Sequence, residues 1–161
     1  MSQPTPADVR VRVAEGPADR EACFAVRKEV FVAEQGVDEA IEYDAFDAPE
    51  SDTVHVLAEG PDGPLGTGRL LHGPAAAGAT GGEPGVGSLG RLAVRQAARG
   101  LGVGAALVRG LEGAAAQLGL CAVDLHAQTH ALGFYERLGY QAYGPEFEDA
   151  GIGHRAMRRE L

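Results

Sequence analysis

The feature that most restricts the fold of this chain is a glycine-rich turn between a short apolar run and a helix. The turn reads RQAARGLGVGAAL over residues 95–107, follows SLGRLAV (88–94) and continues into an alanine- and leucine-rich stretch that ends at Leu118. Glycines allow positive φ angles and close approach to the main chain. The first N–H groups of a helix lie unpaired at its positive end. The segment therefore predicts a site for a phosphate group.

Two kinds of phosphate ligand fit this turn. Gly100, Gly102 and Ala105 match the G-x-G-x-x-A pattern of a dinucleotide-binding turn, and Asp124 imitates its ribose-binding acidic residue. In that motif, however, the first glycine follows the strand almost at once, whereas residues 95–99 intervene here. Too little chain follows Asp124 for the remaining βαβ units. A nicotinamide-dependent oxidoreductase is therefore a less favoured alternative. Another alternative is that the loop binds nothing and only shapes a tight turn between strand and helix.

The charge balance disfavours large anionic partners. The chain has 161 residues, with 14 Lys and Arg against 23 Asp and Glu, and a formal net charge of -9. This composition provides no basic surface for nucleic acid or an anionic membrane. No apolar run approaches the roughly 20 residues of a membrane span, and the N-terminus lacks an apolar signal core. We expect a cytoplasmic protein with a small-molecule ligand, no nucleic acid and no membrane partner.

The hydrophobic pattern predicts one mixed α+β domain. Residues 1–8 are expected to be a flexible N-terminal leader, and residues 9–161 a single domain of a size that forms one core. Acidic residues 33–52, Gly/Ala/Pro-rich residues 74–87 and residues 145–153 are expected to be loops. Strands are predicted near 9–13, 53–60, 65–73, 88–94, 120–127, 140–144 and 154–161, and helices over 18–31, 101–118 and 129–139.

The two cysteines indicate no metal or redox site. Cys23 and Cys121 lie far apart, with no C-x-x-C or Cys/His spacing typical of zinc. We expect no bound metal, and both thiols are expected to be buried and reduced.

Two motifs carry a resemblance to a known family. RGLGVG (99–104) matches [RQ]-x-x-G-x-[GA] in full, and AQTHALGFYERLGY (127–140) is similar to A-x-x-[LF]-Y-x-x-x-G-[FY]. The chain thus resembles the GNAT superfamily of acyl-CoA N-acyltransferases. VRKEVFVAEQGVDEAIEYDAFD (26–47) and GIGHRAM (151–157) look like a small bacterial subgroup that has an F-V-x-E-Q segment.

The resemblance implies a fold and a cofactor. The fold is a mixed, mostly antiparallel sheet, splayed between strands four and five and flanked by helices, in a family where homodimers are common. The cofactor is acetyl-CoA (coenzyme A), with its pantetheine arm in the splay. Gln128 stands where the family usually has Asn and would contact this arm. The main chain of Leu92, Ala93 and Val94 would pair with the arm, and Arg99, Gly100, Leu101, Gly102, Val103, Gly104 and Ala105 would hold the pyrophosphate.

The resemblance also suggests catalytic groups. Tyr135 matches a tyrosine near the thioester sulfur and is expected to protonate the leaving thiolate; alternatively, it is a core residue with its hydroxyl bonded to the backbone. Gly90 stands where many relatives have a glutamate, which leaves the general base open. The candidates are Glu34, His126 and His154. Each also has a structural interpretation: Glu34 as a helix cap, His126 as an interior side chain, and His154 as a partner of a neighbouring loop.

The expected activity is transfer of an acetyl (acyl) group, other than an aminoacyl group, to a primary amine of a small molecule by direct attack in a ternary complex. The alternative is a non-catalytic module that binds or senses coenzyme A or acyl-CoA. The acidic segment 38–52 is either a solvated loop or the border of an acceptor pocket that attracts a cationic amine. Arg69 and Arg91 either pair with this loop or bind a substrate carboxylate.

Overall fold

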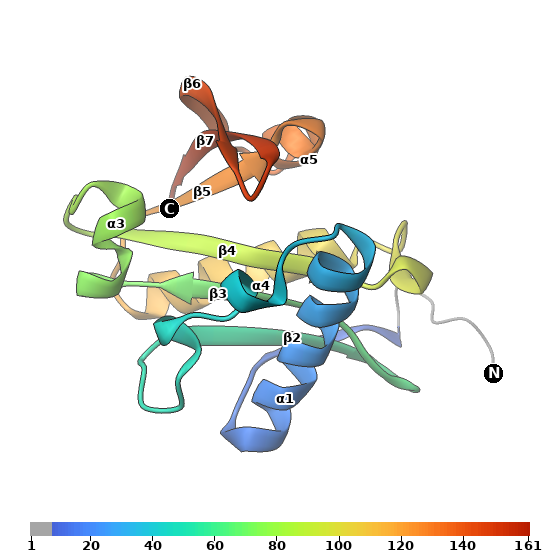
Figure 1. The fold of residues 1–161 in the computed structure, drawn as a ribbon. Helices are drawn as coiled ribbons and strands as arrows, with labels where there is room; N and C mark the ends of the chain where they lie inside the picture. Colours follow the sequence, from blue (N-terminus) through green and yellow to red (C-terminus); the bar gives the residue numbers. More distant parts are fainter. Residues whose placement is uncertain (1–7) are drawn as a thin grey trace.

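Seven strands form one twisted sheet in the computed structural model, which describes residues 8–161 (Figure 1). The strand order is β1-β2-β3-β4-β5-β7-β6, and all neighbouring pairs are antiparallel except β4 with β5. The predicted leader, residues 1–8, lies outside the described residues except for Asp8, so the domain boundary at residue 9 stays a prediction. The strands are β1 (Arg10–Val13), β2 (Val54–Gly60), β3 (Gly63–Leu71), β4 (Val86–Val94), β5 (Ala122–Gln128), β6 (Gln141–Asp149) and β7 (Ile152–Glu160).

The α+β fold with a mixed, mostly antiparallel sheet is confirmed. A doubly wound nucleotide-binding domain has a mostly parallel sheet, whereas only β4 and β5 are parallel among the described strands. The nicotinamide alternative is therefore wrong.

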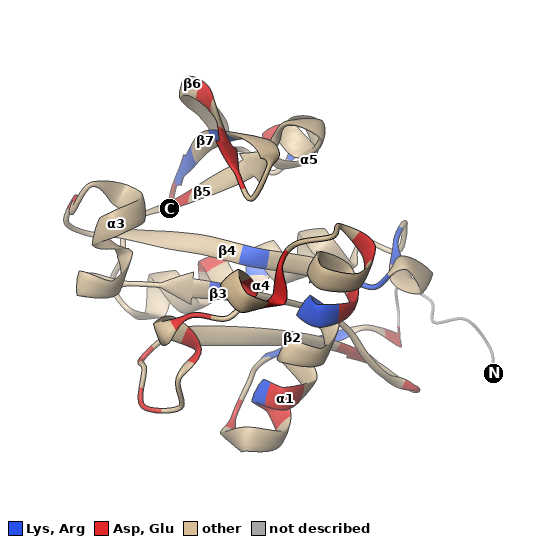
Figure 2. Cartoon of the chain, in the orientation of Figure 1, with Lys and Arg blue, Asp and Glu red and all other residues tan. Residues whose placement is uncertain are grey.

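The helices include short elements that the sequence pattern did not predict. Residues 33–52, expected to be a loop, contain α2 and a 3₁₀ turn, and Asp38 and Asp44 cap these two elements through side-chain oxygens. This segment carries acidic residues across from basic residues on α1 and β4 (Figure 2). The helices are α1 (Gly16–Arg27), continued by a π-helical segment (Lys28–Glu34), α2 (Glu39–Glu42), α3 (Ala77–Thr80), α4 (Val103–Gln117) and α5 (Leu132–Arg137).

Two other predicted loops are also partly regular. Residues 74–87 contain α3, and β4 begins at Val86. Residues 145–153 belong largely to the β6–β7 hairpin, because the register shift between Tyr143 and Phe147 accommodates Pro145 on an edge strand. The bulge disrupts the alternating pattern that predicts a strand. Both thiols are free, but Cys121 is exposed rather than buried.

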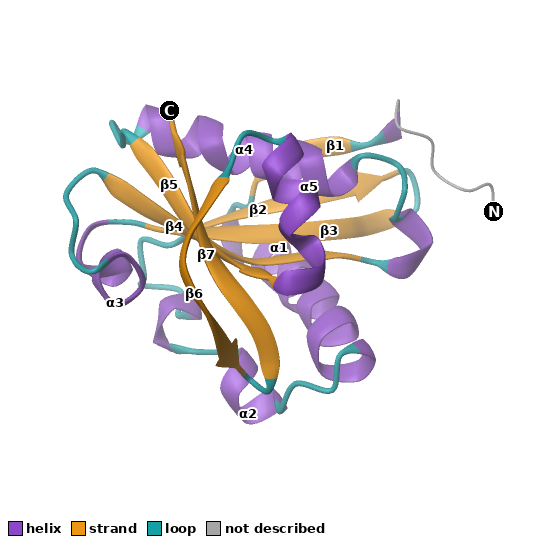
Figure 3. Ribbon diagram, turned by 90° about the horizontal axis from the view of Figure 1, so that it is seen from above, coloured by secondary structure: helices purple, strands orange, loops and turns teal. Residues whose placement is uncertain are grey.

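Helices cover both faces of the sheet. α1 and α4 lie on opposite faces of the β1–β4 part (Figure 3). On the α4 side, Leu107 and Leu111 are fully buried in the main core with Leu70 of β3. On the α1 side, Val26 and Val30 pack with Ala93 in a second, smaller cluster. Each helix thus holds one face of β4.

The sheet opens beside the C-terminal half of β4, as predicted. β4 and β5 pair only as far as Leu89 and Leu125. Beyond this point β4 remains paired with β3, while β5 continues along β7 and turns away with it (Figure 1). A register shift in β4 places Arg91 in the left-handed region at φ 53°. The bulge and the end of the ladder leave residues 90–94 at the border of an opening.

Candidate active site

Two cavities meet in the opening between β4 and β5. A groove of about 780 Å³ follows β4 toward the start of α4, and a cavity of about 270 Å³ lies on the other side, toward α2 and the β6–β7 turn. Four side chains line both: Phe31, Gln35, Leu92 and Gln128. The two cavities are therefore adjacent and share a boundary formed by these four side chains.

Most residues expected at the cofactor line the groove. These are Leu92, Ala93, Val94, Arg99, Gly100, Gly102, Val103, Gly104, Ala105 and Gln128. Leu101 and Tyr135 instead pack with the main core. The glycine-rich turn and the residues before it thus form one wall of a continuous groove.

The glycine-rich turn presents unpaired N–H groups at the start of α4. Gly100 and Gly102 have φ angles of 83° and 78°, and Gly102 is the N-cap. No side chain caps the helix, and its first turn carries no acidic residue. The N–H groups of Val103, Gly104 and Ala105 therefore lack intrahelical acceptors and lie at the positive end of the helix dipole. This arrangement suits an anion with several oxygens.

Gly104 also sets the distance between two helices. A Cβ atom at this position would lie 3.1 Å from Cζ of Phe134, which belongs to α5. The small residues at the start of α4 thus allow α5 to approach, in addition to leaving room for a ligand.

Arg99, the first residue of the loop signature, is bound to the opposite wall of the groove. Its Nη1 and Nη2 donate to the two oxygens of Glu34 at 2.6 and 2.8 Å, and its Nε donates to the Val94 carbonyl. The hydrogen bonds from Arg99 lower the pKa of Glu34. Glu34 is thus a weakly basic carboxylate occupied by an arginine, and this geometry does not favour it as the general base.

Tyr135 of α5 is an interior residue with a free hydroxyl. The side chain is 8% exposed and packs edge-on against Phe134 and Tyr140. Within residues 8–161 its hydroxyl makes no hydrogen bond, so the expected alternative of a hydroxyl bonded to the backbone does not hold. Burial raises the pKa of Tyr135, which keeps the phenol protonated at neutral pH.

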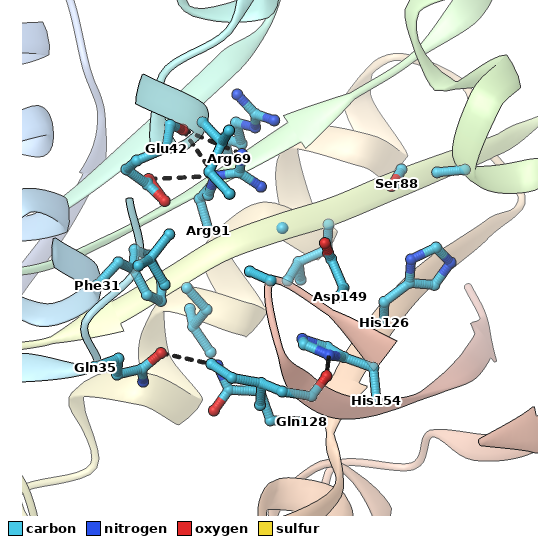
Figure 4. Close-up of a pocket in the computed structure, with 18 of the residues that line it drawn as sticks. Phe31, Gln35, Glu42, Arg69, Ser88, Arg91, His126, Gln128, Asp149 and His154 are labelled. Atoms are coloured by element: carbon cyan, nitrogen blue, oxygen red, sulfur yellow. Dashed lines mark hydrogen bonds and ion pairs between the residues drawn. The ribbon is translucent and has the colours of Figure 1, made fainter. Parts of the chain in front are cut away.

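Gln128 is held across the opening. Its Nε2 donates to Oε1 of Gln35 at 3.0 Å (Figure 4). Its Oε1 lies 2.6 Å from Nε2 of His130. Because Gln35 follows the π-helical segment and Gln128 ends β5, this contact joins the two sides of the opening where the cavities meet.

The two histidine candidates lie in the smaller cavity. Nδ1 of His154 is 2.7 Å from the carbonyl of Ile152. A carbonyl only accepts, so Nδ1 carries a proton and the lone pair of the neutral ring lies on Nε2. Phe147 stacks on His154 and meets the ring of His126 edge-on. His126 is exposed rather than interior.

A buried charge cluster lies at the end of the smaller cavity nearest α2, where Glu42, Arg69 and Arg91 line the cavity. Arg27, 1% exposed, donates to both oxygens of Asp47 at 2.7 and 2.9 Å and to Oε2 of Glu42 at 2.9 Å. Arg69 donates to Asp44 and Asp47. Arg91 donates to the carbonyl of Glu42 and forms ion pairs with Glu42 and Asp44. Arg69 and Arg91 thus pair with the acidic segment, which was one of the two roles expected for them. Three of its carboxylates are neutralised and do not attract a cation.

Sequence reasoning missed Arg27 and Asp149. Arg27 lies on the buried face of α1 with Cys23 and Val26, and Val30 continues this face in the π-helical segment. A charged residue at apolar helical spacing predicts a buried ion pair, so this signal was present. Asp149, which lines the smaller cavity, has no comparable signal because it precedes a turn in a polar stretch.

Comparisons with known proteins agree with this geometry. Residues 19–161 match the family model for the acetyltransferase (GNAT) domain. The uncharacterized N-acetyltransferase YjcF of Bacillus subtilis is 34% identical over 149 residues, which cover 92% of this chain and 97% of that protein. The crystal structure of an acyl-CoA N-acyltransferase from Pseudomonas aeruginosa is 32% identical, with a TM-score of 0.76 and coverage of 94% and 98%.

A more distant neighbour carries a ligand of the expected class. The CoA-dependent acyl-homoserine lactone synthase BjaI, solved with SAM and isopentyl-CoA, has a TM-score of 0.72 at 19% identity and covers 94% of this chain and 82% of that one. None of the helices in residues 8–161 has the length and apolar character needed to cross a bilayer. The match over residues 19–161 and the two relatives above 30% identity show that this chain belongs to the GNAT family of acetyltransferases, enzymes that transfer acyl groups from acyl-CoA.

Proposed function

We propose that the protein transfers an acetyl group from acetyl-CoA to the primary amine of a small molecule, by direct attack in a ternary complex. The observation that carries this proposal is the meeting of two cavities at Phe31, Gln35, Leu92 and Gln128. A donor in the groove and an acceptor in the smaller cavity would face each other at that boundary. Such an arrangement supports direct transfer, because the reacting atoms can be held close together.

The residues of the groove fit acetyl-CoA. The N–H groups of residues 103–105 and the turn before them would hold the pyrophosphate, and the main chain of Leu92, Ala93 and Val94 would pair with the pantetheine arm. Bound acetyl-CoA supplies an activated acyl group on sulfur. The bulge in β4 interrupts its pairing with β3 close to the boundary of the cavities, where a main-chain N–H would polarise the acyl carbonyl.

His154 is the best-supported general base among the three candidates. Glu34 is occupied by Arg99 and has a lowered pKa. His154 lines the smaller cavity and is oriented by the Ile152 carbonyl, so its lone pair is on Nε2. The exposed ring of His126 lacks a hydrogen bond of this kind among the described residues. His154 Nε2 would accept the proton that the amine loses as its nitrogen bonds to the acyl carbon.

Tyr135 is the proposed general acid. Its raised pKa keeps it a proton donor, and its hydroxyl has no competing partner within residues 8–161. Tyr135 would give its proton to the sulfur as the carbon–sulfur bond breaks, and solvent would restore that proton after product release.

Two measurements on the whole chain test this proposal. Calorimetry with acetyl-CoA should show binding, and thiol release with a panel of small primary amines should show turnover. Binding without thiol release would favour the non-catalytic alternative, and absence of binding would remove acetyl-CoA as the donor. His154→Asn keeps an amide N–H for the Ile152 carbonyl but lacks Nε2, so turnover should fall while acetyl-CoA affinity is retained. The homodimer, the cytoplasmic location and the amine acceptor stay predictions.

A further inference from the structure

The two ends of the smaller cavity differ in charge. Arg69 and Arg91 lie at the end nearest α2, whereas Asp149, His126 and His154 lie across the cavity on β5 and the β6–β7 hairpin (Figure 4). Glu42 also lines the first end, but its carboxylate is 3% exposed and is paired with Arg27 and Arg91. The cavity therefore has guanidinium groups at one end, here called its cationic end, and groups that can accept protons at the other.

Arg91 occupies a backbone position that would suit glycine better. Its φ of 53° lies in the left-handed region, which is unfavourable for a residue that has a side chain. A glycine here would avoid this strain, so the position indicates a role for the side chain itself. Nε and Nη2 contact the carbonyl of Glu42. Nη1 has no hydrogen-bond partner within residues 8–161. One donor of Arg91 is therefore available at the cavity.

Arg69 also lines this end of the cavity and has a donor that is unpaired within residues 8–161, but that donor is buried. Its side chain is 5% exposed. Nη1 and Nη2 are bonded to Asp44 and Asp47, but Nε is buried and has no partner among the described residues. A buried donor without an acceptor leaves the positive charge of Arg69 incompletely compensated. Because Arg69 lines the cavity, this charge acts on a ligand there even though Nε itself is buried.

The charge cluster carries no excess negative charge that would repel an anion in the cavity. Three arginines, Arg27, Arg69 and Arg91, stand against Glu42, Asp44 and Asp47, so no carboxylate is in excess. Burial, followed by the charge of Arg69, lowers the pKa of Arg91. A negative group beside Arg91 would oppose both effects, whereas a second positive group would add to them.

The remaining lining and the volume limit the size and polarity of the ligand. The walls include the apolar side chains of Phe31, Val37, Ile41, Leu71, Leu89 and Ile152. The volume of about 270 Å³ is below the range of roughly 300–1,000 Å³ typical of pockets for drug-sized ligands. A small molecule with an apolar body fits this space.

We propose that the acceptor is a small amino carboxylate with an apolar side chain. Its carboxylate lies against Arg91 and Arg69, and its amino group lies toward His154 and Asp149. This inference rests on the proposed function and specifies the chemical class of the acceptor. The carboxylate and the amino group, at opposite ends of the acceptor, set its orientation in the cavity. Bidentate contact with a guanidinium also gives geometric selection for a carboxylate.

The test uses matched sets of acceptors with acetyl-CoA and the whole chain. Each set contains one apolar amino acid (alanine, valine, leucine, isoleucine, methionine or phenylalanine), its amide and its decarboxylated amine, with spermidine as a cationic comparison. Thiol release gives kcat/KM for each acceptor. At least one amino acid should exceed its amide and amine by about tenfold or more, as expected for a charge-assisted contact.

Variants of Arg91 assign this preference to the cationic end. Arg91→Gly relieves the positive φ, and thermal unfolding checks that the protein is folded. The variant should raise KM for the preferred amino acid about tenfold or more and leave values for the matched amine nearly unchanged. Arg91→Lys keeps the charge without the forked geometry and should give an intermediate KM. Arg10→Ala, an exposed arginine on β1, is the control and should change neither value.

The outcomes separate this inference from the proposed function. Preference for amides, amines or spermidine, or an equal effect of Arg91→Gly on all acceptors, overturns the amino carboxylate and leaves acetyl transfer intact. If no acceptor releases thiol, the proposed activity fails, and calorimetry on the protein saturated with coenzyme A decides the inference. Amino acid binding that Arg91→Gly abolishes supports it, and absence of binding by all six amino acids overturns it.

Discussion

Replacing Arg27 by methionine removes one cation from the buried charge cluster and leaves a flexible apolar side chain in its place. Arg27 is 1% exposed and makes four hydrogen bonds, two to Asp47, one to the Glu42 carboxylate and one to the Glu42 carbonyl. Without it, Asp47 keeps Arg69 as a partner and Glu42 keeps Arg91. Each carboxylate thus loses one of its two arginines, and the cluster acquires an uncompensated negative charge.

The expected decrease in the free energy of unfolding follows from the ion pairs that remain in the variant. Removing one partner of a buried ion pair costs about 3–5 kcal/mol, because a charge is left buried without compensation. Since both carboxylates keep another arginine, we expect the lower part of this range, about 3 kcal/mol, for Arg27→Met. Domains are stable by about 5–15 kcal/mol, so the variant should still fold.

The control is an arginine with two carboxylate partners at the surface. Arg12 pairs with Asp19 at 2.5 Å and Glu59 at 2.7 Å, but its side chain is 44% exposed. Water replaces its partners when it is removed, so Arg12→Met should change the free energy of unfolding very little. Urea unfolding of the protein and both variants, followed by circular dichroism, measures the difference directly.

The effect of Arg27→Met should also depend on pH. Burial raises the pKa of Asp47, but hydrogen bonds and charges, mainly those of Arg27, outweigh burial and lower it to about 2. A carboxyl with a depressed pKa stabilises the folded state above its ordinary pKa of about 3.9, and this contribution is lost as the pH falls toward 2. The difference in unfolding free energy between the unchanged protein and Arg27→Met should therefore be larger at pH 7 than at pH 3. Equal losses of unfolding free energy in Arg27→Met and Arg12→Met would refute the reasoning, as would a difference for Arg27→Met that does not change with pH.

Three further predictions concern the site. Tyr135→Phe should lower kcat by about 10²-fold or more with little change in calorimetric acetyl-CoA affinity; unchanged turnover would remove Tyr135 from the mechanism. Gly102→Ala places a side chain at φ 78°, so unfolding should show a loss of about 1–2 kcal/mol with weaker acetyl-CoA binding, whereas Gly113→Ala in open space within α4 should not destabilise. Gly90 faces the smaller cavity, and a Cβ there meets no atom within 4 Å. Gly90→Glu should therefore restore part of the thiol-release rate lost in His154→Asn, and no recovery would argue against a base at this wall.

The sequence predicted the glycine-rich turn and the helix after it because both are built from local pattern. RGLGVG needs only its own glycines and the following helix to form the turn, and Tyr135 lies within a continuous helical motif. Short elements were missed where tertiary contacts hold them: α2 lies in an acidic stretch whose charges are balanced by arginines from α1, β3 and β4. No local periodicity reports such contacts.

Sequence alone determined the family resemblance, the α+β class and the glycine-rich turn before α4, because each depends on residues adjacent in the chain or on simple periodicity. The tertiary structure decided which groups are available for chemistry. It paired Glu34 with Arg99, left His154 with a lone pair on Nε2, and placed Arg91 beside Arg69 with unused donors. Long-range pairing in the sheet sets these contacts, since the end of the β4–β5 ladder brings residues from distant segments around one opening.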